Sequence, residues 1–257
     1  MRLEAGEPEQ KTITMTPGGD GSGVTIRVPR GFGAWYLHFP ETMLLEGPAQ
    51  GKAEMTKTEK DGAIILSGKM EGEFAHSIQI TYRPGEDVID VGLEVSNLSQ
   101  AKWPDGGEAM ACLRPVESPE FSEEDGRRTF VFFRGELRPV ADVMTEFGKA
   151  LGPTTTVSLM VKGERMAPFQ AQRHDARMTM DDGLILRASV DNKRVAAFAW
   201  DRVHRVSMNF TYSCMHSNPR ITDLAPGAKD VRRGRIYFLD GSTEDFLKRY
   251  RQDFGRK

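Results

Sequence analysis

Hydrophobic and polar residues alternate most regularly on either side of the segment Arg-Pro-Gly-Glu-Asp at 83–87. Apolar side chains recur at every second position around it: Ile78, Ile80 and Tyr82, then Ile89, Val91, Leu93 and Val95. A period of two is that of a β-strand with one apolar face. Because Pro-Gly favours a turn between the two runs, the pattern predicts a long antiparallel hairpin.

The same alternation recurs less regularly along most of the chain, between turn-forming pairs such as Asp-Gly and Pro-Gly. It predicts further strands near 11–16, 23–29, 33–39, 52–57, 62–68, 108–114, 128–134, 155–162, 183–190, 194–200, 205–213 and 232–239. So many short strands with few helices predict an all-β fold in which two large antiparallel sheets pack face to face.

The end of the chain follows a helical period instead. Ser242 and Asp245 have the spacing of a capping box, and Gly255 suits a helix end. Apolar residues at three-to-four-residue spacing form one stripe: Phe246, Leu247, Tyr250 and Phe254. We therefore expect a helix at about 243–254 that docks on the sandwich, and a weaker helix at about 139–150.

Composition limits the class of protein. A length of 257 residues suits one large β domain spanning 1–257. The chain has 35 Lys and Arg against 37 Asp and Glu, so a formal charge of −2 disfavours nucleic acid as a partner. There is no apolar run of about 20 residues and no signal-peptide core near the N-terminus. We expect a soluble protein without membrane contact, cytoplasmic as written, although a longer precursor could be exported; the oligomeric state stays open.

The two cysteines, Cys112 and Cys214, lie far apart in the sequence and lack Cys-x-x-Cys spacing. This spacing disfavours a zinc ribbon or a thioredoxin-type motif. Two buried free thiols are the simplest interpretation, and a disulfide is the alternative in an exported protein.

Potential chemistry is densest between residues 204 and 239. His216 follows Cys214 in the turn predicted after the strand 205–213, and its near-neutral pKa suits a general acid or base. The alternative is a structural histidine bound to loop backbone. His204 lies at the opposite end of that strand, so we expect it outside the same small site. Loops and motifs typical of nucleotide binding or helix-borne zinc are absent from the sequence.

A second histidine, His38, lies in an aromatic strand. Alternation places Tyr36 and His38 on one face and Trp35 on the other, which we expect to be core. An aromatic ring beside an imidazole suits stacking on a sugar with a hydrogen bond or metal ligand nearby. Packing at the edge of the core is the alternative.

Four further side chains are candidates for ligand binding. Trp103 could be a flat stacking platform, and Asp105 could accept hydroxyl hydrogen bonds. Alternatively, Trp103 plugs the sandwich and Asp105 belongs to a turn. Asn209, on the strand before His216, could orient hydroxyls. Arg233 could bind the carboxylate of a sugar acid, or simply belong to an exposed basic strand face.

Two runs of the sequence resemble galactose mutarotase-like proteins of the β-supersandwich group. They are DVIDVGLEVSNLSQAKWPD, a long strand before a Trp-bearing loop, and PRITDLAPGAKDVRRGRIYFL, a Pro-Gly turn before a closing strand. The resemblance implies a large two-sheet supersandwich whose concave face binds carbohydrate. Aldose epimerases of this group use a histidine and a carboxylate to open and close a sugar hemiacetal, but their usual histidine motifs are not found here.

Three functions follow as hypotheses. The first is an enzyme, an epimerase, lyase or hydrolase, acting on a mono- or oligosaccharide, with His216 and His38 as catalytic residues. Tyr36, Trp103, Asp105, Asn209 and Arg233 are its predicted substrate-binding residues. The second is a noncatalytic carbohydrate-binding module. The third is an enzyme with a divalent metal held by His38, His216 and a carboxylate such as Glu41. No cofactor is required by the sequence.

Overall fold

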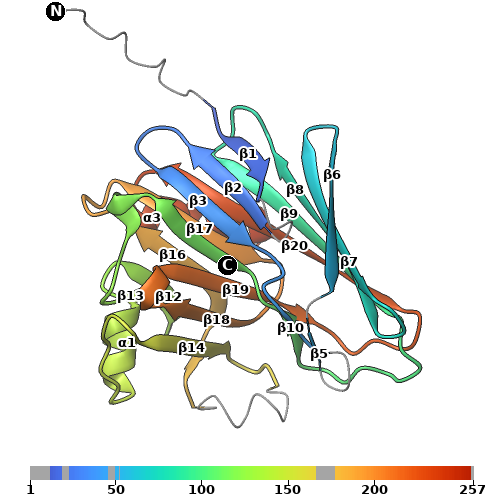
Figure 1. Ribbon diagram of the computed structural model, residues 1–257. Helices are drawn as coiled ribbons and strands as arrows, with labels where there is room; N and C mark the ends of the chain where they lie inside the picture. Colours follow the sequence, from blue (N-terminus) through green and yellow to red (C-terminus); the bar gives the residue numbers. More distant parts are fainter. Residues whose placement is uncertain (1–11, 19–22, 46–49, 52, 166–176, 256–257) are drawn as a thin grey trace, which may run out of the picture.

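Twenty β-strands form two stacked sheets in the computed structural model, which describes residues 12–18, 23–45, 50–51, 53–165 and 177–255 (Figure 1). Two predicted strands begin at positions 11 and 52, which lie outside the described residues, as does the N-terminal segment 1–11. No helix of the described part is long and apolar enough to cross a membrane.

The first sheet has eleven strands and carries the candidate site. Its main path runs β1-β2-β3-β11-β19-β10-β4-β5, and β18, β14 and β15 continue it beyond β19. Every pairing in it is antiparallel except that of β14 with β15. The strands are β1 (Thr14–Pro17), β2 (Gly23–Val28), β3 (Gly33–His38), β4 (Met43–Leu44), β5 (Gln50–Gly51), β10 (Gly107–Ala109), β11 (Cys112–Glu117), β14 (Thr156–Val161), β15 (Thr179–Met180), β18 (Val203–Asn209) and β19 (Cys214–Ile221).

The second sheet has nine antiparallel strands in the order β13-β12-β16-β17-β20-β9-β8-β7-β6. They are β6 (Glu54–Lys60), β7 (Ala63–Met70), β8 (Phe74–Tyr82), β9 (Val88–Asn97), β12 (Thr129–Phe133), β13 (Glu136–Pro139), β16 (Asp182–Ala188), β17 (Arg194–Trp200) and β20 (Lys229–Asp240). The predicted hairpin is its β8–β9 pair, in register from Tyr82 opposite Ile89 outward.

The core lies between the two sheets and is filled by alternate residues of their strands. Trp35 and Leu37 of β3 face Phe198 of β17 and Phe238 of β20 there, all with no solvent exposure. The predicted faces of the hairpin also point into this core. Side chains at the intervening positions of the eleven-stranded sheet therefore point to its outer face.

Four short helices complete the described structure: η1 (Pro119–Phe121), α1 (Val140–Glu146), η2 (Phe210–Tyr212) and α3 (Thr243–Phe254). The C-terminal helix α3 begins and ends as predicted, with a Ser242–Asp245 capping box and Gly255 in the left-handed conformation. Its apolar stripe covers the outer face of the nine-stranded sheet in a second cluster with Val195 and Tyr237. This confirms the predicted all-β sandwich with a C-terminal helix.

One predicted strand is wrong in a way that changes the site. The strand expected at 205–213 ends at Asn209, and η2 leads directly into β19, which begins at Cys214. His216 therefore lies inside a central strand and not in a turn. The run Ser217-Asn218-Pro219 has turn-like composition, but it continues the strand, with Asn218 opposite Arg205 and Pro219 opposite Val203.

Candidate functional site

A cavity of about 320 Å³ opens on the outer face of the eleven-stranded sheet. One cross-strand row supplies its floor: His38 of β3, Cys112 of β11, His216 of β19, Ser207 of β18 and Ser158 of β14 are successive register partners. Register partners project on the same side of a sheet. All five line the cavity.

A second row lies two residues further along the same strands. It adds Arg114, Cys214, Asn209 and Thr156 to the cavity wall. Met110 and Arg205 extend the wall at the other end, while Glu41 and Tyr212 come from the loop after β3 and from η2. Polar side chains from five strands thus converge on one small volume.

His216 is buried on the cavity floor between two acceptors. Its Nε2 atom lies 3.1 Å from Oε2 of Glu41, and its Nδ1 atom lies 3.3 Å from the carbonyl oxygen of Ser207. Burial lowers the pKa of His216, but the hydrogen bond to Glu41 and the negative charge near it outweigh this effect and raise the pKa overall. The geometry therefore favours a protonated imidazole beside a carboxylate.

Glu41 is held in place by its backbone. Its N–H donates to the carbonyl oxygen of Met110 at 2.8 Å, and the N–H of Met110 donates to Thr42 at 2.9 Å. The loop after β3 is thereby fixed to the segment between β10 and β11. This contact positions the backbone of Glu41 at the cavity edge, from which its carboxylate reaches His216.

His38 and His216 lie on the same face, on either side of Cys112. Two strand spacings separate their Cα atoms, which is about 10 Å. The structure thus brings together the two histidines that the sequence proposed as catalytic. It does not bring Glu41 together with both of them as a metal cluster, because the described metal-capable group is Cys112, Cys214 and His216.

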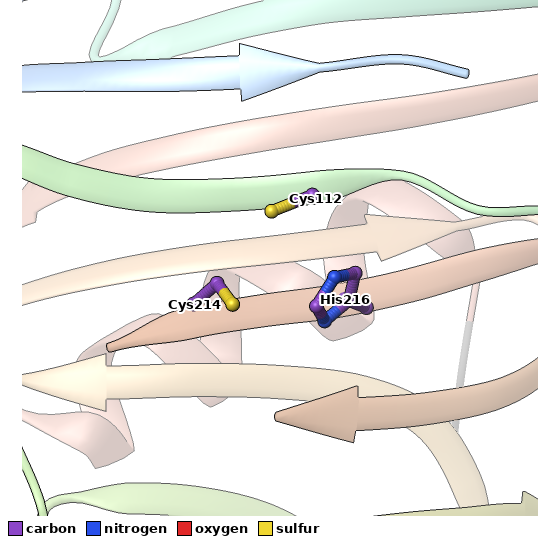
Figure 2. A group of neighbouring side chains, drawn as sticks. All are labelled: Cys112, Cys214 and His216. Atoms are coloured by element: carbon purple, nitrogen blue, oxygen red, sulfur yellow. The ribbon is translucent and has the colours of Figure 1, made fainter. Parts of the chain in front are cut away.

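The two cysteines are free and buried, as expected. Figure 2 shows Cys112 on β11 beside Cys214 and His216, which project from one face of β19. A hydrogen bond from the thiol of Cys112 lowers the pKa of Cys214 to about 6, and the charge of His216 adds to this effect while burial opposes it. The same hydrogen bond, together with burial, raises the pKa of Cys112.

A buried ionic network lies beside the cavity, on the same face of the sheet. Glu108 accepts from Nδ1 of His204 at 2.8 Å and binds the guanidinium of Arg205, and Asn218 donates to it at 3.2 Å. Burial opposes ionisation, but Arg205 and His204 lower the pKa of Glu108 to about 2. Arg205 in turn donates to Ser158 at 3.0 Å. His204 therefore lies outside the cavity wall. The antiparallel β18–β19 pairing nevertheless brings it nearer to His216 than the predicted strand did.

The sequence analysis did not identify Arg114 and Tyr212, which line the cavity wall and are well placed to contact a ligand. Arg114 lies over the ring of Tyr36, 5.3 Å from its centroid, and its Nε atom is buried without a hydrogen-bond partner among the described residues. Tyr212 is 59% exposed at the cavity mouth. Tyr36, a predicted binding residue, does not line the cavity, and Arg114 covers its ring. Tyr212 therefore replaces Tyr36 as the candidate stacking residue.

Three predicted binding residues lie elsewhere. Trp103 is 3% exposed and packs in the main core, so it cannot stack on a ligand. Asp105 forms an ion pair with Arg220 away from the cavity wall. Arg233 belongs to β20 of the other sheet, where it lines a separate surface hollow with Arg235. Sequence alternation indicates which residues share a strand face, but not which sheet holds the strand.

Asn209 does line the cavity, and it also caps η2. Its Oδ1 atom accepts from the N–H of Thr211 at 2.9 Å. The amide group then remains as the donor toward a ligand. The sequence held one signal for these wall residues. If β19 had been recognised as a strand, alternation would have placed Cys214 and His216 on one face of it, as it places Cys112 and Arg114 on one face of β11.

The fold is a two-sheet β-sandwich with a polar cavity on one outer face, and solved structures place it in a known class. Comparison of the sequence with protein-family models and with curated proteins gives no match. A galactose mutarotase related enzyme from Lactobacillus acidophilus is similar in structure, with a TM-score of 0.51 at 9% identity over 91% of this chain and 97% of that one.

An α-N-acetylgalactosaminidase from Bifidobacterium bifidum, solved with GalNAc, has a TM-score of 0.53 at 11% identity. The match covers 96% of this chain and 39% of the bifidobacterial enzyme. Together, these likenesses show that the chain has the galactose mutarotase-like β-supersandwich fold, as the resemblance in sequence implied.

Proposed function

We propose that the chain binds a mono- or oligosaccharide in the outer-face cavity and acts on it by acid–base chemistry. The observation that carries this proposal is the His216–Glu41 pair, 3.1 Å apart at a cavity otherwise lined by hydroxyl, amide and guanidinium groups. Such groups donate to and accept from sugar hydroxyls. Two solved proteins of the same fold are named for sugar substrates, which supports the choice of ligand class.

The wall suggests how a sugar would be oriented. Tyr212 offers an exposed ring for stacking against the apolar face of a sugar. Asn209, Ser158 and Ser207 offer hydrogen bonds from the floor. Arg114, with its buried Nε unpartnered among the described residues, suits a carboxylate substituent and takes the role predicted for Arg233.

The acid–base step assigns opposite tasks to the two members of the pair. For a hemiacetal, Glu41 accepts the proton of the anomeric hydroxyl while the ring C–O bond breaks, and His216 donates a proton to the departing ring oxygen. The reverse transfers close the ring with either configuration. His38, on the other side of Cys112, is the candidate second contact to the substrate. Convergence of titratable groups favours this function over a noncatalytic binding module.

The test is a thermal-shift screen of neutral sugars and sugar acids, followed by polarimetry or NMR exchange with any sugar that stabilises the chain. We expect E41Q to lower turnover by about 100-fold or more while binding changes by less than about 3-fold. R114A should weaken binding of sugar acids by at least about 10-fold.

R233A is the matched control, because it removes an exposed arginine from the other sheet, and it should change neither property. A sugar that binds without turnover in the unmodified protein would support the noncatalytic module instead. Full turnover in E41Q would overturn the acid–base assignment.

A further inference from the structure

Three buried donor atoms meet at the centre of the cavity floor. The Sγ atoms of Cys112 and Cys214 and a ring nitrogen of His216 all lie within 4.8 Å of one another. Each residue is at most 6% exposed, yet all three line the cavity. In Figure 2 the three side chains lie on one face of the neighbouring strands β11 and β19.

This donor set matches the preference of a borderline-soft metal ion. Two thiolates and an imidazole are ligands for Zn²⁺, which binds sulfur at about 2.3 Å and nitrogen at about 2.0 Å in tetrahedral geometry. Ligand atoms around such an ion lie about 3.3 to 3.8 Å apart. The three donor atoms lie within 4.8 Å of one another, so ion binding requires them to approach by up to about 1.5 Å.

The surroundings of His216 already favour one ligand nitrogen. The protonated ring donates from Nδ1 to the carbonyl of Ser207, 3.3 Å away, and from Nε2 to Glu41, 3.1 Å away. A metal ion on Nε2 takes the place of the proton there, while Nδ1–H keeps its hydrogen bond to the carbonyl. A hydrogen bond from the remote nitrogen to a backbone carbonyl is the usual support for a metal-binding histidine.

The strand register favours a bridging ion over a disulfide. Cys112 lies directly opposite His216, so Cys214 is its diagonal neighbour across the β11–β19 pair. Diagonal neighbours have Cβ atoms about 7 Å apart, whereas a disulfide requires about 4 Å. An ion between the sulfur atoms needs no such approach of the backbones.

We propose that Cys112, Cys214 and His216 form a Zn²⁺-class metal site that opens into the cavity. Three protein ligands leave the fourth position of the ion facing that space, where water or a ligand oxygen binds. Each thiol gives up its proton on binding. Three ligands with an open position are the arrangement of catalytic and exchangeable zinc sites.

The metal site does not rest on the proposed acid–base function, but it shares His216 with it. A metal on Nε2 takes the lone pair that a proton needs, so His216 cannot be the acid while the ion is bound. We therefore expect the acid–base activity to belong to the metal-free protein and Zn²⁺ to suppress it.

The test uses the full chain, stripped with a chelator under reducing conditions and titrated with Co²⁺. We expect one Co²⁺ per chain, thiolate-to-cobalt charge-transfer absorption and displacement by Zn²⁺. C112S and C214S should each weaken Zn²⁺ binding by more than about 100-fold. H76Q is the matched control, since His76 is a buried histidine of the other sheet with Met55 as its neighbour, and it should bind as the unmodified protein does.

E41Q separates the two proposals. It should retain the charge-transfer absorption because both sulfur ligands remain, although it loses the proposed sugar chemistry. Failure of the sugar chemistry in the unmodified protein would leave this metal binding intact.

Thiol reactivity in the unmodified protein provides a measurement that requires no variant to fold. Bound Zn²⁺ should slow alkylation of Cys112 and Cys214 by at least about 10-fold, as followed by mass spectrometry. Equal alkylation with and without Zn²⁺, or a Co²⁺ complex without charge-transfer absorption, would overturn the site.

Discussion

The outer faces of the two sheets are built from opposite chemistry. On the nine-stranded sheet, outward residues of β16 and β17 such as Leu184, Leu186 and Val195 are apolar and lie under helix α3. On the eleven-stranded sheet, outward residues of β11, β18 and β19 are cysteines, arginines, a serine, an asparagine and a histidine around an open cavity. Both sheets direct their other face to the same core.

The difference shows that strand periodicity alone does not decide whether the outer face of a sheet is covered by a helix or left open as a cavity. β17 is buried along six of its seven residues, and after Arg194 these six form a continuous apolar run, Val-Ala-Ala-Phe-Ala-Trp. A helix must cover such a strand. β19 is buried along its whole length too, but its outward residues are polar and are satisfied by neighbouring strands. A helix there would cover the polar side chains that line the cavity.

Removing the contact between helix α3 and the nine-stranded sheet should have the largest effect on the free energy of unfolding. Phe246 is fully buried, with its ring 5.1 Å from that of Tyr237 and 6.2 Å from that of Tyr250. We expect F246A to lower the free energy of unfolding by about 3 to 5 kcal/mol, as measured by urea denaturation. A loss below about 1 kcal/mol would show that α3 is not needed to stabilise that face.

Breaking the buried Glu108–Arg205 network beside the cavity should come next. E108Q leaves the buried guanidinium of Arg205 without its carboxylate, and we expect a loss of about 3 kcal/mol in the same measurement. E117Q is the control, because Glu117 pairs with Arg27 on the surface, where both side chains are more than half exposed. Its cost should stay below about 1 kcal/mol. Equal losses in the two variants would contradict a special role for the buried network.

Acid should lower the stability of the folded chain by protonating the Glu108 carboxylate. The pKa of Glu108 is about 2 in the folded chain against 4.5 for the free group, so the unfolded chain takes up the proton first. The stability that Glu108 provides is complete above pH 4.5 and is lost as the pH falls toward about 2, on the order of 3 kcal/mol. The free energy of unfolding, measured across this pH range, should fall less steeply for E108Q than for the unmodified protein. Parallel curves for the two proteins would contradict the prediction.

Removing the N-cap of α3 should destabilise the helix that covers the apolar face, by less than the loss of Phe246 does. Ser242 accepts from the backbone N–H of Asp245 at 3.2 Å and begins the helix. We expect S242A to cost about 1 kcal/mol in thermal or urea unfolding, because one helix N–H loses its partner. Sugar and metal binding should be unchanged, since the cavity lies on the other sheet.

The smallest effect on stability is expected at the cavity mouth. Tyr212 is largely exposed, so Y212A should change the unfolding free energy by less than about 0.5 kcal/mol. Affinity for a bound sugar should nevertheless fall by about 5-fold, as measured by calorimetry, because a stacking ring is lost. V231A, which truncates an exposed residue of the other sheet, is the control for both measurements. Unchanged affinity in Y212A would remove Tyr212 from the site.

Much of the scaffold could be predicted because its signals are local. The β8–β9 hairpin and the helix Thr243–Phe254 follow from period, turn chemistry and capping within short windows of sequence. The same local alternation placed Tyr36 and His38 on one face and Trp35 in the core. Short strands such as β4 and β5 have too few residues to show a period.

The site was predicted only in part because its contacts are nonlocal. His38, His216 and Asn209 were identified as single residues, and the structure places all three on the cavity. Trp103 and Arg233 were not separable from them by sequence. Trp103 lies outside the named strands and turns into the core, and Arg233 is exposed on the other sheet, and neither outcome is encoded in local alternation.

The sequence by itself determined the strand periods, the terminal helix and the two-sheet class of this protein. Only the tertiary structure decided that Cys112 and Cys214, about 100 residues apart, lie on neighbouring strands beside His216. The physical reason is that alternation fixes the side on which a residue projects within its own strand. Which strands become neighbours is decided by hydrogen bonding and burial summed over the whole sandwich, and that sum brings the cavity residues together.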